Sequence, residues 1–151
     1  MDNLLSLTLI ANLGTNDEDG AIHLIPMWFL RVENYICIPT YHTHKYRNLR
    51  ARPRASVMID RSQTGLNLKG VLIRGHVELV EGEEARKINR MIHLKYIMPE
   101  AISDANVSSN LSKGDDVTVK VHMDQVISWN LADSKAGKAL QVGGWSRPLD
   151  A

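Results

Sequence analysis

The sequence predicts a mainly β protein, a barrel of antiparallel strands with helices packed on its outside. Hydrophobic and polar residues alternate with a period of two over much of the chain, which is the pattern of half-buried strands. Only two segments carry a helical pattern, and both are flanked by strand patterns. Residues 22–30 are apolar on both faces, which indicates a strand that lies between the core and a partner, as in a barrel with a dimer interface.

The first part of the chain is expected to form an antiparallel meander. Residues 6–13 are apolar and β-branched enough for a strand, and the acidic stretch 17–20 ends in glycine and is a turn signal. Strands are then predicted over residues 22–31 and 35–40, with a turn between them.

A short helix and two strands follow. The helix is predicted over residues 44–52 and ends before Pro53, because the residue before a proline is disfavoured in the α region. The next strand covers residues 55–59. The clearest alternation in the chain covers residues 71–79.

A longer helix is predicted over residues 83–98. Its apolar stripe includes Ala85, Ile88 and Ile92, and Pro99 ends it. Residues 100–113 are expected to form a polar loop, and residues 117–123 the final strand. We therefore divide the chain into a barrel domain, residues 1–131, and a C-terminal tail, residues 132–151, which is expected to be mobile or to lie across a partner.

Length and composition favour a soluble single domain. The chain has 151 residues and a formal net charge of +1, from 18 Lys+Arg against 17 Asp+Glu. This balance argues against a surface built to hold nucleic acid or anionic lipid. Cys37 is the single cysteine, the longest apolar run is too short to span a bilayer, and the first residues lack the basic region of a signal peptide. We expect a cytoplasmic protein.

One segment concentrates positive charge. Residues 42–54 contain five Lys or Arg residues and no acidic residue. Within this segment Thr43 and His44 lead into the short helix, and Lys45 and Asn48 lie on its first turns. The free N–H groups of a helix start, a hydroxyl, an ammonium and an amide together make a phosphate cradle. The alternative is a solvated basic face, which local sequence alone favours slightly.

Other chemistry finds less support. His42 and His44 supply only two ligands with no acidic residue near in sequence, so no metal site is expected. Cys37 is interpreted as a packing residue, and no pair of catalytic carboxylates is evident, so catalytic residues are not assigned and a bound cofactor would carry the reactive atoms. Only Tyr41 and Tyr46 accompany the basic residues, so nucleic-acid binding is not expected.

Two prolines interrupt predicted strands. Pro26 and Pro39 each remove a donor from the hydrogen-bonding ladder. Lying on neighbouring strands, they would leave backbone groups free for a flat ligand. The alternative is a core strand with a bulge, which explains the apolar neighbours but explains the pair of prolines less well.

Five segments in order resemble a known family. They are LIANLGT (9–15), DGAIHLIPMWF (19–29), YICIPT (35–40), HKYRNLRARPRASVMID (44–60) and GVLIRGHVELV (70–80). Together they resemble the pyridoxamine 5'-phosphate oxidase-like split-barrel family of flavin- and deazaflavin-binding oxidoreductases, from about residue 9 to residue 129. The pattern K-x-x-N-L-x-x-x-P-R-A, which begins at Lys45, is the most specific part.

The resemblance implies a six-stranded antiparallel split barrel with two or so outer helices, which forms a homodimer with two cofactor sites at its interface. It implies that the phosphate contacts come from Thr43, Lys45 and Asn48, which reverses the preference for a solvated face. Lys69 and Gly70 would approach the cofactor from the same or the partner subunit, and Trp129 would lie just after the final strand. The full expected cofactor-binding set is Pro26, Met27, Trp28, Ile38, Pro39, Thr40, Thr43, His44, Lys45, Asn48, Lys69, Gly70 and Trp129.

The expected function follows from the resemblance and its departures. True pyridoxamine phosphate oxidases carry an arginine on the strand before the cofactor loop, where this chain has Ala-Ile-His-Leu at residues 21–24. We therefore expect an FMN-dependent oxidoreductase that transfers hydride to or from an unidentified small molecule rather than a vitamin B6 oxidase. The alternatives are a reductase that uses the deazaflavin coenzyme F420, and a non-catalytic FMN-binding carrier or sensor. Neither nucleic acid nor membrane is expected as a partner.

Overall fold

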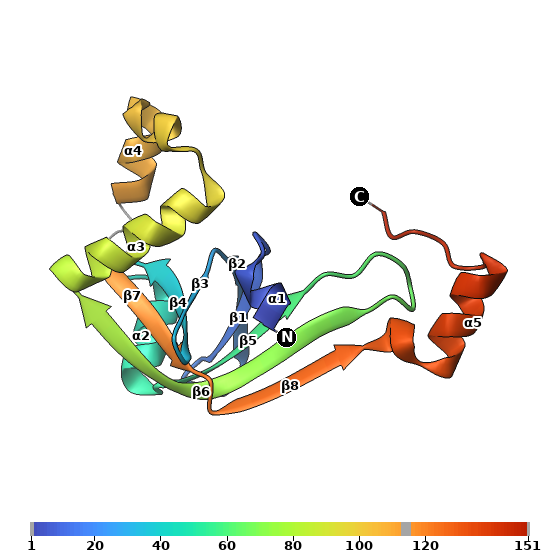
Figure 1. Ribbon diagram of the computed structural model, residues 1–151. Coiled ribbons are helices and arrows are strands. Elements are labelled where there is room, and N and C mark those ends of the chain that lie inside the picture. The colour runs from blue at the N-terminus through green and yellow to red at the C-terminus, as the bar shows by residue number, and fades with distance from the viewer. Residues whose placement is uncertain (1, 113–115, 151) are drawn as a thin grey trace.

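The computed structural model describes residues 2–112 and 116–150. It confirms the predicted class, because one curled antiparallel sheet forms most of the molecule and the helices pack around it (Figure 1). In chain order the elements are α1 (Asp2–Ser6), β1 (Ala11–Asn16), β2 (Ile22–Met27), β3 (Leu30–Val32), β4 (Tyr35–Thr40), α2 (His44–Ala51), β5 (Arg54–Asp60), β6 (Lys69–Glu81), α3 (Glu83–Tyr96), the 3-10 helix η1 (Pro99–Ser103), α4 (Ala105–Ser112), β7 (Val117–His122), β8 (Gln125–Asn130), the 3-10 helix η2 (Leu131–Asp133) and α5 (Lys135–Gly143).

The strands follow the order β2-β1-β5-β6-β7-β4-β3, and β8 also pairs with β6. All these pairings are antiparallel. The long strand β6 joins the two parts of the sheet, because residues 70–76 pair with β5 while residues 77–81 pair with β7. The first half of β6 and β8 form a ribbon that extends from the barrel towards α5 (Figure 1).

A β-bulge separates β7 from β8. Val121 pairs with Val77 of β6, and Gln125 pairs with Arg74. The β7–β8 side therefore holds one residue more than the β6 side between these pairs, which bends the strand. Gly75 lies opposite the bulge, where an added Cβ would come within 1.8 Å of a backbone oxygen, that of His122. The close approach explains the glycine.

The core lies inside the curl of the sheet. The inward residues of each strand alternate with outward ones, as the period of two predicts. The largest fully buried side chains are Phe29, Leu5, Leu13, Ile36, Ile38, Leu49, Ile59, Ile73, Ile92, Val57, Val71 and Val117. No helix among the described residues is long and apolar enough to cross a membrane.

Several expected boundaries near the N-terminus are wrong. Residues 6–13 do not form one strand, because α1 precedes them with Leu4 and Leu5 buried, and β1 begins only at Ala11. Residues 22–31 are divided into β2 and β3 by Trp28 and Phe29. The described residues thus contain eight strands rather than the six that the resemblance implies.

The helices outnumber the expected two. The predicted loop over residues 100–113 is wrong as far as residue 112, because η1 and α4 occupy most of this segment. Asp104 Oδ1 caps α4 by accepting hydrogen bonds from the backbone N–H groups of Asn106 and Val107. Residue 113 lies outside the described part. The tail contains α5, which Ser134 caps by accepting from the N–H of Gly137 and which Gly144 ends with a φ of 64°. Trp129 lies within β8 and not after the final strand.

Candidate functional site

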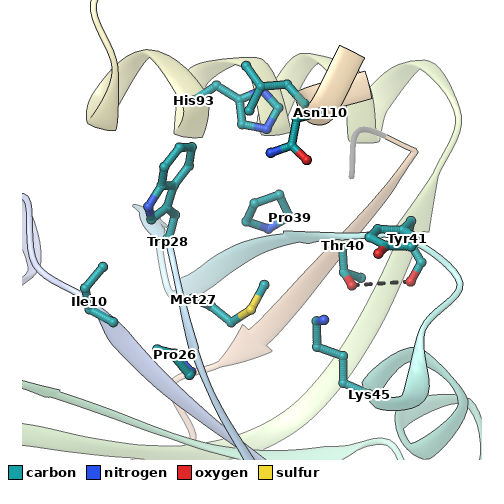
Figure 2. Close-up of a pocket in the computed structure, with 11 residues that line it drawn as sticks. Ile10, Pro26, Met27, Trp28, Pro39, Thr40, Tyr41, Lys45, His93 and Asn110 are labelled. Carbon is teal, nitrogen blue, oxygen red and sulfur yellow. Dashed lines mark hydrogen bonds between the residues drawn. The ribbon is translucent and has the colours of Figure 1, made fainter. Parts of the chain in front are cut away.

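A cavity of about 440 Å³ opens where the ends of β2 and β4 meet the start of α2 and the helices α3 and α4 (Figure 2). Its volume is typical of small-molecule sites. Six of the thirteen residues expected to bind a cofactor line it, namely Pro26, Met27, Trp28, Pro39, Thr40 and Lys45. Five residues that the sequence did not single out for a site complete the lining, namely Ile10, Tyr41, His93, Asn110 and Leu111.

The two prolines meet at this cavity. The expectation that they lie on neighbouring strands is wrong. Pro26 belongs to β2, which pairs with β1 at the end of the sheet path, and Pro39 belongs to β4. The strand β3 pairs with β4 only as far as Cys37, so among the described residues β7 alone pairs with β4 at Pro39. Both prolines therefore stand where a strand has one free side, which is where proline is tolerated.

Trp28 forms an aromatic wall of the cavity. Its ring stacks on Tyr96 of α3 with centroids 5.0 Å apart and planes 2° apart, and it meets His93 edge-on at 6.2 Å. Phe29 N–H donates to the Tyr96 hydroxyl at 3.3 Å, and Lys95 Nζ donates to the Phe29 carbonyl at 3.1 Å. The helix α3 thus supplies partners for the backbone between β2 and β3, and the same contacts fix the orientation of Trp28.

Lys45 is the charged residue of the cavity lining. It is 7% exposed, and its ammonium points into the cavity from the first turn of α2 (Figure 2). Burial lowers the pKa of Lys45. None of the described residues forms a hydrogen bond or an ion pair with this ammonium. A buried cation without a partner is costly, and an anion placed in the cavity would offset that cost.

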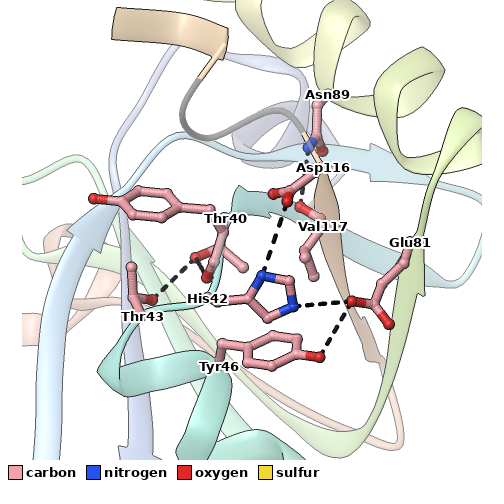
Figure 3. A network of polar contacts seen from close by, with 9 residues as sticks. Thr40, His42, Thr43, Tyr46, Glu81, Asn89, Asp116 and Val117 are labelled. Carbon is pink, nitrogen blue, oxygen red and sulfur yellow. Dashed lines mark hydrogen bonds and ion pairs between the residues drawn. The ribbon is translucent and has the colours of Figure 1, made fainter.

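The loop before α2 is held by a polar network (Figure 3). His42 Nε2 lies 3.2 Å from Glu81 Oε1, and the Tyr46 hydroxyl donates to the same oxygen at 3.2 Å. Thr43 is the N-cap residue, but its hydroxyl makes no capping bond and lies 3.4 Å from the Thr40 hydroxyl. The first N–H groups of α2 therefore have no side-chain acceptor from Thr43.

Two of the expected cofactor-binding residues, Asn48 of the phosphate cradle and His44 beside it, face another direction. Asn48 is buried and donates from Nδ2 to Thr15 Oγ1 at 3.1 Å and to Asp17 Oδ1 at 2.7 Å. His44 Nε2 lies 2.6 Å from the same Asp17 oxygen. Hydrogen bonds from Asn48 and His44 lower the pKa of Asp17. Neither Asn48 nor His44 lines the cavity.

Four other expected residues also lie away from the cavity lining. Ile38 is fully buried in the barrel core. Lys69 begins β6, and Gly70 pairs with Trp129 of β8, where an added Cβ on the glycine would come within 2.5 Å of the indole. The ribbon thus brings Lys69, Gly70 and Trp129 close to one another.

His93 was missed because, in the predicted helix over residues 83–98, it was interpreted as lying at the border of the apolar stripe. The buried residues of α3 are Ala85, Asn89, Ile92 and His93. His93 follows Asn89 by four positions, so both lie on the face that packs on the sheet. That spacing is the signal that could have found His93. Asn110 and Leu111 carry no comparable signal, because the segment of α4 is too polar to predict which side faces the barrel.

Comparison with known proteins agrees with the fold. The model of the family described as pyridoxamine 5'-phosphate oxidase matches residues 1–130. A conserved hypothetical protein of Mycobacterium tuberculosis, Rv2991, is 26% identical with a TM-score of 0.70, and the match covers 85% of this chain and 81% of that chain. A protein described as an F420 reductase is 23% identical with a TM-score of 0.65, covering 83% and 94%. A FAD-binding protein of Mesorhizobium loti is 21% identical with a TM-score of 0.59, covering 84% and 88%. No curated protein matches the chain.

Proposed function

Because the chain belongs to the pyridoxamine 5'-phosphate oxidase family, we propose that its cavity binds FMN and that the protein is a flavin-dependent oxidoreductase acting on a small molecule. The observation that carries this proposal is the buried ammonium of Lys45, which faces the cavity without a carboxylate partner among the described residues. A phosphate supplies the negatively charged partner that the Lys45 ammonium lacks, and the start of α2 supplies free N–H groups beside that phosphate.

The rest of the cavity suits a flat aromatic ring. Pro26, Met27 and Pro39 offer apolar contact, and Trp28 is held rigid by its stack on Tyr96. When bound, a flavin or deazaflavin supplies hydride transfer, and the chain binds and orients the ring and excludes water from it. His93 lies beside Trp28 at the far side of the cavity from Lys45, where a small-molecule substrate would meet the ring (Figure 2).

We further propose that the protein acts as a homodimer. Ile22 and Leu24 of β2 are 73% and 66% exposed, and they line a shallow hollow together with Met58 and Leu72 of the adjoining strands. Exposed apolar patches of this kind mark interaction surfaces. In a dimer, Lys69, Gly70 and Trp129 of one subunit would complete the cavity of the other, since they do not line the cavity of their own chain.

The experiment that tests cofactor binding identifies what the purified protein holds. Denaturation followed by mass spectrometry names the released compound, and titration of the cofactor-free protein with FMN and with F420 separates the two cofactors. We expect FMN to bind, and Lys45→Ala to weaken binding by about 10- to 100-fold, because a hydrogen bond to a charged group is lost. Arg47→Ala is the matched control, since it removes an exposed cation from the same helix.

Two outcomes contradict the proposal. Equal FMN affinity in Lys45→Ala and wild type would contradict the proposal that Lys45 binds the cofactor phosphate. Failure of the wild type to bind either cofactor would contradict the proposed function. Turnover of reduced nicotinamide with a panel of small-molecule acceptors then separates an enzyme from a carrier, because a carrier binds FMN without turnover.

A further inference from the structure

We propose that His76, His122 and Asp124 bind a divalent transition-metal ion on the outer face of the barrel, at the bulge between β7 and β8. Each of the three residues offers one ligand atom, and these atoms all lie within 4.8 Å of one another. The site is separate from the cavity, because none of the three residues lines it. It was not expected from the sequence, in which His76 lies far from His122 and Asp124.

The fold brings the two histidines face to face. Val77 of β6 pairs with Val121 of β7, so the next residues, His76 and His122, are cross-strand neighbours on the outer face. Their rings stack with centroids 3.5 Å apart and planes 23° apart. Strands rather than loops therefore fix the backbone positions of both histidines. An imidazole nitrogen binds a metal ion in the plane of its ring, so at least one of the two stacked rings would turn out of the stack for both to bind one ion.

The bulge adds the carboxylate. Asp124 Oδ2 lies 2.7 Å from His76 Nδ1 and also accepts from the His76 backbone N–H at 2.9 Å. Gly75 permits this geometry, because a side chain there would meet the His122 carbonyl and the Asp124 carboxylate. The same sequence feature that creates the bulge thus places an oxygen ligand beside an imidazole.

A further carboxylate stands at the edge of the cluster. Glu78 Oε2 lies 3.2 Å from His122 Nε2, yet this nitrogen is buried and makes no hydrogen bond with acceptable geometry. A buried ring nitrogen without a hydrogen bond calls for another partner, and a metal ion is one. Asp124 and Glu78 together balance the charge of a dication.

The donor set selects the class of metal. Two imidazoles with one or two carboxylates suit Zn²⁺, Co²⁺ or Ni²⁺. The single thiol of the chain, Cys37, is buried in β4 away from this face, so a site for a soft cation such as Cu⁺ is not formed. A bound ion would link β6 to the β7–β8 bulge at the point where the ribbon leaves the barrel.

A second group of possible ligands, Asp17, His23 and His44, is a weaker candidate. The carboxylates of both groups already accept hydrogen bonds from the chain. The groups differ in their ring nitrogens, because His122 Nε2 is buried without a hydrogen-bond partner and no described atom of Asp17, His23 or His44 is. The group remains useful as a control, because it offers the same residue types on the same protein.

The test measures Zn²⁺ and Co²⁺ binding to full-length protein freed of metal by a chelator. We expect one ion per chain by equilibrium dialysis, a visible absorption band for bound Co²⁺, and a higher melting temperature with Zn²⁺. His76→Ala and His122→Ala should each weaken binding by about 100-fold or more, since loss of even an outer-sphere partner costs about 10- to 100-fold. His23→Ala and His42→Ala should leave binding unchanged.

The design remains decisive if one variant folds poorly. The His76 side chain is 50% exposed, so His76→Gln changes the ligand with little change in packing, and its circular dichroism should match that of the wild type. Three results would overturn the proposal. They are no binding of either ion to the wild type, unchanged binding in the His76 and His122 variants, or a loss of binding in His23→Ala instead.

Discussion

Basic residues that lie close together in the segment 42–54 have different surroundings in the structure, and the sequence alone does not predict these differences. Lys45 is buried at the cavity, whereas Arg47, two residues further along the helix, is exposed. Arg52 donates to the Asn16 carbonyl at 2.8 Å and to Asn48 Oδ1 at 3.2 Å, so it helps to hold α2 on β1. The helix has eight residues and is polar on most sides, so hydrophobic periodicity could not predict which cation faces inward. The family resemblance predicted Lys45 as a contact of the cofactor phosphate, and Lys45 lines the cavity. It did not predict that Asn48 bonds to Asp17.

We expect a lysine of α3, Lys95, to make the stability of the protein depend on pH. Desolvation lowers the pKa of Lys95 to about 8 from its ordinary value of 10.5, and its ammonium lies 3.8 Å from the centroid of the Phe29 ring. Between these two pKa values the unfolded chain binds more protons at this group than the folded chain does. The contribution of Lys95 to the free energy of unfolding therefore rises with pH in that window and is constant below it.

We expect Lys95→Met to remove that rise. Urea unfolding of wild type and variant at pH values from about 7 to about 10 should show the wild type gaining stability relative to Lys95→Met as the pH increases. Lys87→Met, an exposed position of the same helix, serves as the control. Parallel curves for wild type and Lys95→Met would contradict the expectation.

At the scale of elements, local alternation predicted the central strands and failed where distant contacts decide the structure. The strands β4, β5, β6 and β7 were predicted to within two residues at each end, and in β5 and β6 buried residues alternate with more exposed ones. The break between β2 and β3 was missed, because it depends on Tyr96, which lies 67 residues from its partner Phe29. The strand β8 was missed because most of its residues are exposed on both faces, so no alternation marks it.

The bulge between β7 and β8 depends on one glycine. Because a Cβ at Gly75 would lie 1.8 Å from the His122 oxygen, Gly75→Ala must push backbone apart. We expect a loss of about 3 kcal/mol in the free energy of unfolding, at the upper end for overpacking. Gly65→Ala is the matched control, since a Cβ there meets no atom within 4 Å, and it should change stability by less than about 0.5 kcal/mol. Chemical denaturation compares the two variants. Equal free energies of unfolding would contradict the expectation and show that the strands move apart at little cost.

At the scale of the whole molecule, the cavity forms only when segments far apart in the chain come together. The sequence located one part of its lining, because the prolines, Trp28 and Lys45 belong to segments that resemble the family. It did not locate the side formed by His93, Asn110 and Leu111, because that side depends on how α3 and α4 fold back over β4 (Figure 2). The ribbon residues Lys69 and Trp129 lie outside the cavity of their own chain, so their expected role depends on a second copy.

A substitution on the exposed face of β2 tests whether the protein forms the proposed homodimer. Leu24 is 66% exposed and lines the hollow beside β2, so Leu24→Asp should leave the single chain folded while placing a charge in the proposed interface. Sedimentation should show a wild-type dimer and a variant shifted towards monomer, whereas Met91→Asp, at a 58% exposed apolar position on α3, should remain dimeric. If the partner supplies Lys69 and Trp129 to the cavity, Leu24→Asp must also lose FMN affinity as it dissociates. A monomeric wild type would contradict the dimer, and a monomeric variant with full FMN affinity would show that one chain binds the cofactor alone.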